Sequence, residues 1–185
     1  MTSALALTAC GPGNTAPAGS QPNHATTTGQ AALTYKPGTA AANGAPDNTG
    51  DFASPGSATA AQWVQLTSAA AGTLNPVVVN GAGFTLYRFD KDTADPSQSN
   101  CNGACAVTWP PVVVNPNGKI FLSGVPKSEI GVVKRADGKL QVTVGGWPVY
   151  LFSKDTAPGQ TNGEGVGGTW FAVSPQGAKV IPLTG

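Results

Sequence analysis

GFTLYRFDKDTA at residues 83–94 aligns without gaps on GWPVYLFSKDTA at residues 146–157, and this internal repeat decides the fold. Both copies contain Tyr-x-Phe-x-Lys-Asp-Thr-Ala, and a Thr-Trp pair follows each copy, ending at Trp109 and Trp170. Self-similarity of this kind is the signature of a duplicated structural unit. We therefore predict one compact domain at residues 62–185, made of two tandem repeats at about 62–124 and about 125–185.

The repeated motif has the alternation of a β-strand. At strand spacing, Tyr87 and Phe89 project to one face of a sheet and Leu86 projects to the other. Tyr150 and Phe152 have the same places in the second copy. We predict that the two aromatic pairs belong to equivalent strands, which meet in a pseudo-symmetric core.

An aspartate follows each of these strands, Asp92 in the first repeat and Asp155 in the second. A carboxylate at this place can accept backbone N–H groups and close the turn that follows. We therefore predict a structural role for both aspartates, which complete the repeat motif together with the two tyrosines and two phenylalanines.

Short β-branched and aromatic runs separated by turn signals indicate an all-β fold. Asn-Gly or Asp-Gly pairs stand before or between such runs at residues 80–81, 117–118 and 137–138. These pairs favour tight turns between antiparallel strands. The sequence therefore predicts pseudo-symmetric antiparallel β repeats, and the one competing element is a helical turn from Ser128 to about Val133.

Residues 1–10, MTSALALTAC, end like a bacterial lipobox. Leu7 to Cys10 fit the pattern Leu-x-Ala-Cys, in which a signal peptidase cuts after a small residue and the cysteine sulfur carries the lipid. A full export signal has a charged start and roughly 7 to 15 apolar residues, so we expect the complete signal to be longer than this segment. We predict lipidation at Cys10. The alternative is a chance cysteine in an alanine-rich segment.

The two remaining cysteines are expected to form a disulfide. The chain has three cysteines, and lipidation of Cys10 leaves Cys101 and Cys105 to pair. Asn102 and Gly103 lie between them and allow a tight turn. We predict a bond that fixes a local loop. A redox-active pair is the alternative, although no basic residue stands beside these cysteines in the sequence to lower a thiol pKa.

Residues 11–61 have the composition of a spacer. They consist mainly of Ala, Gly, Pro, Thr, Asn and Ser, and their charges are Lys36, Asp47 and Asp51. Such a segment offers few bulky apolar side chains to bury, so we predict a disordered tether between the lipid and the folded domain.

Composition excludes several functions. The formal net charge is +1, which provides no basic surface for nucleic acid. The chain has one histidine, His24, and one methionine, Met1, so the usual ligand sets for a metal or haem cannot be assembled in the domain. We predict no metal and no cofactor. Asp90, Asp92 and Asp95 could offer carboxylates to calcium, but a solvated turn is favoured.

Aromatic and acidic residues supply two further hypotheses. Trp109, Trp147 and Trp170 could form a shallow surface that binds glycan, although tryptophans in small β domains usually pack in the core. Paired carboxylates for glycoside hydrolysis could come from Asp92, Asp155 and Glu164, but spacing in the sequence does not establish their separation in space. We therefore assign no catalytic residue.

The motifs together resemble a family of exported bacterial lipoproteins built from tandem secreted repeats with a Tyr-x-(Phe/Trp/Tyr)-x-x-Asp signature. The resemblance covers about residues 63–181 and includes Tyr87 to Asp92, the Cys101–Cys105 segment, Arg135 to Gly138 and Trp147 to Tyr150. It implies an extracytoplasmic location and a repeat architecture. It implies no reaction, because the family has no assigned one.

The function expected from these observations is a binding or structural module of the cell envelope, anchored by lipid to the outer face of the cell membrane. Its partner would be a cell-wall component or an envelope protein. A cell-wall polymer hydrolase and an accessory protein of a membrane redox system are the two alternatives.

Overall fold

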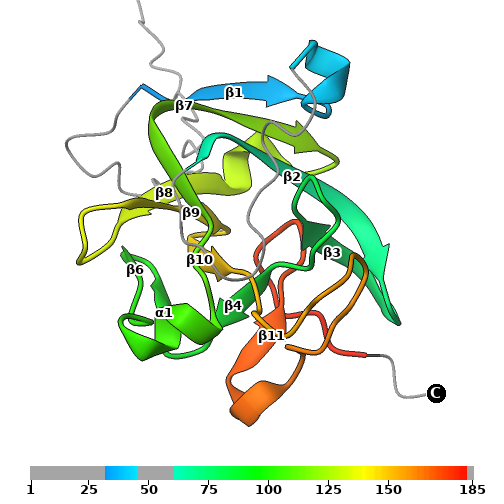
Figure 1. Cartoon of the computed structure of the whole chain (residues 1–185), viewed down its shortest axis with the longest axis vertical. Coiled ribbons are helices and arrows are strands. Elements are labelled where there is room, and N and C mark those ends of the chain that lie inside the picture. The colour runs from blue at the N-terminus through cyan, green and yellow to red at the C-terminus, as the bar shows by residue number, and fades with distance from the viewer. Residues whose placement is uncertain (1–31, 46–60, 183–185) are drawn as a thin grey trace, which may run out of the picture.

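A computed structural model describes residues 32–45 and 61–182, and it shows a nearly closed, barrel-like sheet (Figure 1). The prediction of an all-β domain built from two repeats is confirmed. The strands are β1 (Thr34–Pro37), β2 (Ala61–Ala71), β3 (Leu74–Val79), β4 (Tyr87–Phe89), β5 (Thr93–Ala94), β6 (Ser97–Gln98), β7 (Val113–Ser123), β8 (Ile130–Lys134), β9 (Leu140–Val144), β10 (Trp147–Tyr150) and β11 (Trp170–Ala172). The helical elements are η1 (Ala41–Asn43), α1 (Ala104–Thr108), η2 (Lys127–Glu129) and η3 (Val166–Gly168).

The main sheet runs in the order β11-β4-β10-β9-β7-β2-β3. β1 adds to β7 and β8 adds to β9, while β5 and β6 form a separate two-stranded ribbon. The two ends of the sheet approach each other, because the Val78 N–H in β3 donates to the carbonyl of Val173, next to β11, at 2.8 Å. This contact explains the barrel-like shape, since closure satisfies edge groups that an open sheet would expose.

Most strand pairs are antiparallel, as predicted, but β7 departs from the prediction. It runs parallel to both β1 and β2. Parallel neighbours require a long crossover, and here the crossover is the first repeat itself, which carries the chain from β3 through β4 and α1 to β7. The turn signals could not show this, because they report only connections between neighbouring strands.

Asn117 and Gly118 do not form the predicted turn between strands. They lie inside β7, where Asn117 has φ +63° and bends the strand. Gly118 has no room for a side chain, because a Cβ would lie 2.7 Å from Val114 Cγ2 and 2.8 Å from the carbonyl oxygen of Gln62. β7 pairs with β9 at Val113 and Val114, before the bend, and most of its pairs with β2 lie after the bend, at residues 119–123.

The Asp137-Gly138 hairpin is confirmed, since it connects β8 to β9 with Gly138 at φ +82°. The helical turn proposed from Ser128 is shorter than expected, because η2 ends at Glu129 and β8 begins at Ile130. α1, which begins between the two cysteines and includes Cys105, was not predicted. None of the helices in the described ranges is long and apolar enough to cross a membrane.

Part of the predicted tether is folded. Residues 32–45 form β1 and η1, and β1 pairs along the edge of β7 (Figure 1). The Ala40 N–H donates to Gln65 Oε1 at 2.7 Å, which fixes the end of this segment on β2. Composition missed it because an edge strand is held mainly by backbone hydrogen bonds, which need few large side chains. The remaining tether residues and Cys10 lie outside the described residues.

Two hydrophobic clusters fill the domain. Alternation along the repeat strands separates them, because Leu86 enters the first cluster and Tyr87 enters the second. The aliphatic cluster contains Val64, Leu66, Val78, Leu86, Val114, Ile120, Leu122, Val125, Ile130, Val142, Val144, Val149, Leu151 and Val173. The aromatic cluster contains Ala71, Leu74, Val77, Val79, Tyr87, Phe89, Cys101, Trp109, Tyr150, Phe152, Trp170 and Ala172. The predicted division of the motif between two faces is therefore observed.

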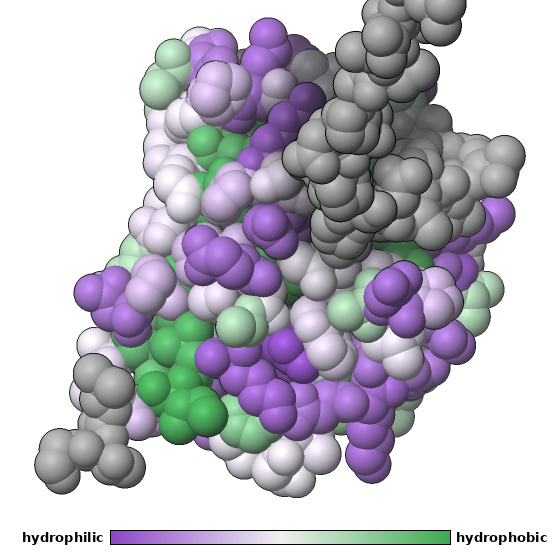
Figure 2. Space-filling model, turned by 180° about the vertical axis from the view of Figure 1, so that it is seen from behind, coloured by the Kyte–Doolittle hydropathy of each residue, from purple (hydrophilic) through white to green (hydrophobic). Residues whose placement is uncertain are grey.

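The surface of the described part carries few large apolar side chains. Val107 in α1, Val166 in η3 and Ile181 are exposed at 72%, 37% and 66%. Figure 2 shows one face of the molecule, where polar residues predominate around a small hydrophobic group.

Candidate functional site

The motif residues of the two repeats interlock across the domain. β4 and β10 are paired antiparallel, with Tyr87 directly opposite Tyr150. The Tyr87 hydroxyl donates to Asp155 Oδ2 at 2.6 Å, and the Tyr150 hydroxyl donates to Asp92 Oδ2 at 2.6 Å. Each tyrosine therefore bonds the aspartate of the other repeat, and the pairs are related by the pseudo-twofold symmetry of the duplication.

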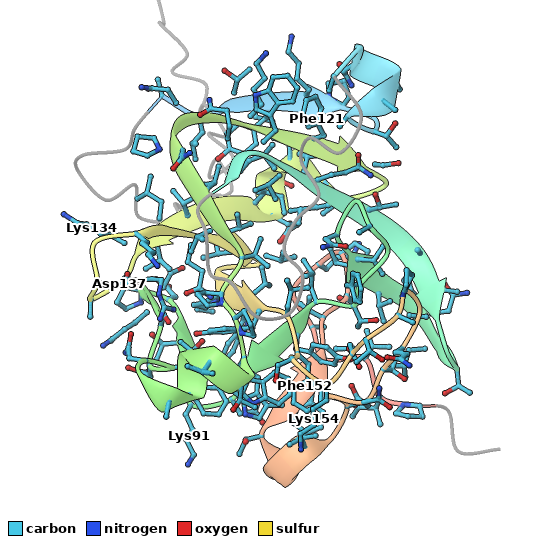
Figure 3. All side chains as sticks on the ribbon, in the orientation of Figure 1. Lys91, Phe121, Lys134, Asp137, Phe152 and Lys154 are labelled. Atoms are coloured by element: carbon cyan, nitrogen blue, oxygen red, sulfur yellow. A yellow bond between two sulfur atoms is a disulfide. The ribbon has the colours of Figure 1, made fainter. Side chains whose placement is uncertain are left out.

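The second oxygen of each carboxylate holds a loop. Asp92 Oδ1 accepts the backbone N–H of Asn100 at 2.7 Å, and Asp155 Oδ1 accepts that of Asn162 at 3.0 Å. The side-chain amides of these asparagines donate in turn to the carbonyl oxygens of Lys91 (2.6 Å) and Lys154 (3.3 Å). Each aspartate thus closes the loop after its own strand and also binds the opposite repeat. Both lysine side chains are exposed, and Figure 3 shows them at the lower edge of the domain.

Burial controls the protonation of these four groups. Asp92 and Asp155 are 3% and 1% exposed, and both tyrosines are fully buried. Burial raises the pKa of each aspartate, although the tyrosine hydroxyl and the asparagine N–H oppose the change by stabilising the charged form. Burial also raises the pKa of each tyrosine, and the neighbouring carboxylate raises it further. The tyrosines therefore act as neutral donors to the carboxylates.

Four aromatic rings form a continuous stack beside these pairs. Phe89 lies on Trp170 with ring centroids 4.1 Å apart, Trp170 lies on Trp109 at 3.9 Å, and Trp109 lies on Phe152 at 4.1 Å. The rings alternate between the first and the second repeat. The two indoles at the centre are nearly parallel, with an angle of 2° between their planes. The stack therefore joins the repeats through their equivalent residues.

The comparisons with known proteins agree with this duplication. A family model described as a secreted repeat of unknown function matches residues 68–113 and again residues 131–174. The chain belongs to this secreted-repeat family. No curated protein and no solved structure matches the chain.

The hypothesis of an exposed tryptophan surface is wrong for two of its three residues. Trp109 and Trp170 are 4% and 5% exposed, because they form the centre of the stack between the secreted repeats. Trp147 is partly buried, and the guanidinium carbon of Arg88 lies 3.3 Å from the centre of its ring. Trp109 and Trp170 therefore offer no free ring face to a glycan, and Arg88 covers one face of Trp147.

The acidic residues do not converge on one another. Asp90 pairs with Lys179 at 2.5 Å and with Arg88 at 3.6 Å, while Asp92 of the same loop points inward to Tyr150. Glu164 Oε2 accepts the N–H of Ala172 at 2.7 Å. Within residues 32–45 and 61–182, no three His, Cys, Asp or Glu side chains are grouped to hold a metal ion.

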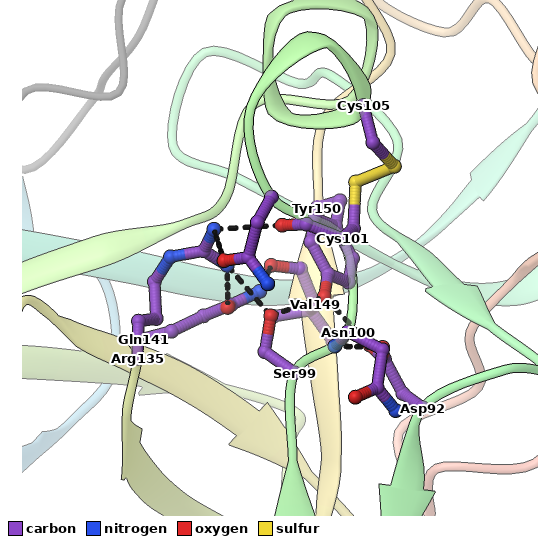
Figure 4. Close-up of a disulfide and its surroundings, with 10 residues drawn as sticks. Asp92, Ser99, Asn100, Cys101, Cys105, Arg135, Gln141, Val149 and Tyr150 are labelled. Atoms are coloured by element: carbon purple, nitrogen blue, oxygen red, sulfur yellow. Dashed lines mark hydrogen bonds between the residues drawn. A yellow bond between two sulfur atoms is a disulfide. The ribbon is translucent and has the colours of Figure 1, made fainter. Parts of the chain in front are cut away.

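The disulfide between Cys101 and Cys105 is present, with the Cα atoms 5.2 Å apart (Figure 4). Cys101 is fully buried in the aromatic cluster, and α1 begins between the two cysteines. The bond thus fixes the start of α1, which leads to Trp109 in the stack.

Arg135 holds the same loop from the second repeat. Its Nη1 donates to Ser99 Oγ at 2.7 Å and to Gln141 Oε1 at 2.6 Å, and its Nη2 donates to the carbonyl oxygen of Cys101 at 2.7 Å (Figure 4). Ser99 Oγ in turn lies 2.8 Å from the Tyr150 hydroxyl. Sequence reasoning did not assign this role to Arg135, because no spacing signal links residues of the two repeats that meet only in the folded chain.

The second repeat has a glycine where the first has a cysteine. Gly163 follows the loop asparagine Asn162, as Cys101 follows Asn100. A Cβ at Gly163 would lie 2.7 Å from Tyr87 Cζ and 3.0 Å from Trp109 Cη2, and its N–H donates to the Tyr87 hydroxyl at 3.3 Å. Close packing therefore excludes a cysteine here, which explains why only one repeat has the disulfide.

Removing the disulfide is expected to weaken the domain moderately. In a Cys101→Ala/Cys105→Ala variant, the free energy of unfolding should fall by about 2 kcal/mol, because the bond closes a very short loop. Urea denaturation of the variant and the parent chain measures the change. Cys10→Ala, which lies outside the closed loop, is the control and should leave the value unchanged. A loss equal to that of a core tryptophan would contradict a merely local role.

Proposed function

We propose that this protein is a structural or binding module of the cell envelope, held by a lipid on Cys10 at the outer face of the cell membrane. The observation that carries the proposal is the reciprocal pairing of Tyr87 with Asp155 and of Tyr150 with Asp92. The motif residues are buried and bonded to one another, so they serve to join two repeats into one rigid unit. Binding of a cell-wall component or an envelope protein would then fall to the exposed loops.

The compartment is supported by two observations. The matching family is described as secreted. A disulfide also persists most readily in an oxidising, extracytoplasmic environment. Both fit a module that is displayed outside the cytoplasm.

The spacer between Cys10 and the folded domain is shorter than predicted, because the described domain begins at residue 32. β1 begins at Thr34, so the segment between Cys10 and the first strand is residues 11–33, shorter than the predicted tether. A lipid at Cys10 would therefore hold the domain closer to the membrane surface than the full predicted tether would, with β1 as the point of attachment.

A polymer hydrolase is less well supported by the geometry. Retaining and inverting glycosidases need two carboxyl groups that flank a bound substrate. Here Asp92 and Asp155 are each engaged by a buried tyrosine and a backbone N–H, and both are more than nine-tenths buried. A substrate could not reach either group without breaking the contact between the repeats.

The anchor is tested by expressing the chain behind a complete export signal and labelling cells with a fatty-acid analogue. We expect the label on the parent chain and its loss in Cys10→Ala, with that variant released from the membrane fraction. Cys101→Ala/Cys105→Ala is the matched control and should keep the label. A labelled Cys10→Ala chain, or an unlabelled parent chain in the membrane fraction, would contradict lipid anchoring at this residue.

A further inference from the structure

Six side chains, the tyrosines and aspartates of the motif and two tryptophans, form one line through the centre of the domain. Tyr87 contacts Trp109 edge-on with ring centroids 5.6 Å apart, and Tyr150 contacts Trp170 edge-on at 5.2 Å. The two indoles stack at 3.9 Å. With the carboxylate at each end, the order is Asp155, Tyr87, Trp109, Trp170, Tyr150 and Asp92. Every neighbour in this line is in contact, and every member is buried.

Tryptophan and tyrosine are among the residue types in proteins that lose single electrons most readily. A stacked indole pair can share the positive charge left by a lost electron over two rings. A phenol loses an electron easily only if its proton leaves at the same time, and this requires a base within hydrogen-bond distance. Each tyrosine of the line has such a base, a carboxylate oxygen at 2.6 Å.

We propose that this line is a one-electron oxidation site, which accepts an oxidising equivalent from an inorganic oxidising radical and stores it as a buried tyrosyl radical. The oxidant takes one electron from the Trp109–Trp170 pair and is reduced. The oxidised pair recovers an electron from a tyrosine, whose O–H bond breaks as the proton passes to the aspartate. The products are a tyrosyl radical, a neutral carboxylic acid and the reduced oxidant.

The two ends of the line are not equivalent, and the position of Arg135 favours Tyr87. The Arg135 guanidinium stabilises the charge on Asp92 and makes it a weaker base, whereas no cation contributes at Asp155. Each phenol oxygen also has a second partner that would remain after its proton has left, the Gly163 N–H for Tyr87 at 3.3 Å and Ser99 Oγ for Tyr150 at 2.8 Å. Arg135 lies at the Tyr150 end of the line only, where its Nη1 donates to Ser99 Oγ at 2.7 Å. We therefore place the stored radical on Tyr87 and its proton on Asp155.

This inference goes beyond the proposed envelope module and does not depend on the lipid anchor. The rest of the chain supplies an internal control. Tyr35, the third tyrosine, lies in β1 with the Lys127 ammonium 5.4 Å from its ring centre. It is outside the line and faces a cation.

Pulse radiolysis of the folded, disulfide-bonded chain with azide radicals tests the proposal. Azide radicals oxidise indole rings, and the indolyl and phenoxyl radicals have separate absorption bands. We expect the indolyl band to decay into the phenoxyl band at a rate independent of protein concentration. Tyr87→Phe should remove more than half of the phenoxyl yield, while Tyr35→Phe should leave it unchanged.

The role of the base is tested separately. Asp155→Asn keeps a hydrogen-bond acceptor but removes the base, so it should slow phenoxyl formation at least about tenfold. Circular dichroism verifies that each variant is folded. If Asp155→Asn does not fold, the parent chain is measured in heavy water, where transfer coupled to proton movement is slower.

Three results would overturn the proposal. The first is indolyl decay that depends on protein concentration in the folded chain. The second is loss of the phenoxyl signal in Tyr35→Phe. The third is an unchanged rate in a folded Asp155→Asn variant, or equal rates in light and heavy water. None of these results bears on lipidation of Cys10, so the two proposals fail independently.

Discussion

Replacing Trp109 with alanine is expected to lower the free energy of unfolding by about 3 to 5 kcal/mol, in the range measured for large aromatic residues removed from protein cores. Trp109 is 4% exposed and is stacked between Trp170 and Phe152, with Tyr87 against its edge. The side chain therefore contacts rings from both repeats, and its removal would leave a cavity where the repeats meet. Urea denaturation followed by circular dichroism measures the loss.

Trp63→Ala is the matched control for this prediction. Trp63 is only partly buried and contacts Phe121 edge-on at 6.2 Å, away from the stack. Its replacement should lower the free energy of unfolding by clearly less than the replacement of Trp109. Equal losses in the two variants would show that the stack is not the main contact between the repeats. The exposed fraction of each ring, rather than its size, is what separates the two expectations.

Replacing Asp155 with alanine is expected to lower the free energy of unfolding by about 2 to 4 kcal/mol, because one buried and one partly buried donor lose their acceptor and an unsatisfied buried group costs about 1 to 3 kcal/mol. The donors are the Tyr87 hydroxyl and the Asn162 N–H. A double-mutant cycle with Tyr87→Phe isolates the contact between the repeats from the loop contact. Asp95→Ala, an exposed aspartate of the equivalent loop, should have little effect.

The stability of the parent chain and of an Asp155→Asn variant, compared at several pH values, tests the direction in which burial shifts the pKa of Asp155. Burial raises the pKa of Asp155 above the ordinary value of 3.8, so the folded chain binds this proton more tightly than the unfolded chain. The stability from this proton is fully present below the unfolded pKa and is lost as pH rises through the folded pKa. The parent chain should therefore gain stability relative to Asp155→Asn as the solution is acidified. A relative loss on acidification would mean that hydrogen bonds outweigh burial at this carboxylate.

The sequence predicted the local pattern of the site well. Alternation in Tyr-x-Phe placed Tyr87 and Phe89 on one face, and the position of Asp92 after the strand placed its carboxylate near backbone donors. Both inferences depend on neighbours within a few residues, where strand geometry fixes the direction of each side chain. The Cys101–Cys105 bond was predictable for the same reason, since its loop is short.

The partners across the domain were not predictable. Tyr87 bonds Asp155 instead of the aspartate of its own repeat, and Arg135 reaches back to Ser99 and Cys101. Such contacts depend on which strands lie side by side, and a single sequence does not show which distant strands pair. The burial of Trp109 and Trp170 could not be decided from the sequence for the same reason, because these rings become buried only when one repeat covers the other.

The amino-acid order alone determined the duplication, the strand character of each copy and the short disulfide loop, because each depends on residues that are close together along the chain. Only the tertiary structure decided that the copies exchange their tyrosine partners, that two indoles stack at the centre and that residues 32–45 add a strand to β7. These features depend on the closure of the sheet, which brings distant segments together and excludes water from the groups between them.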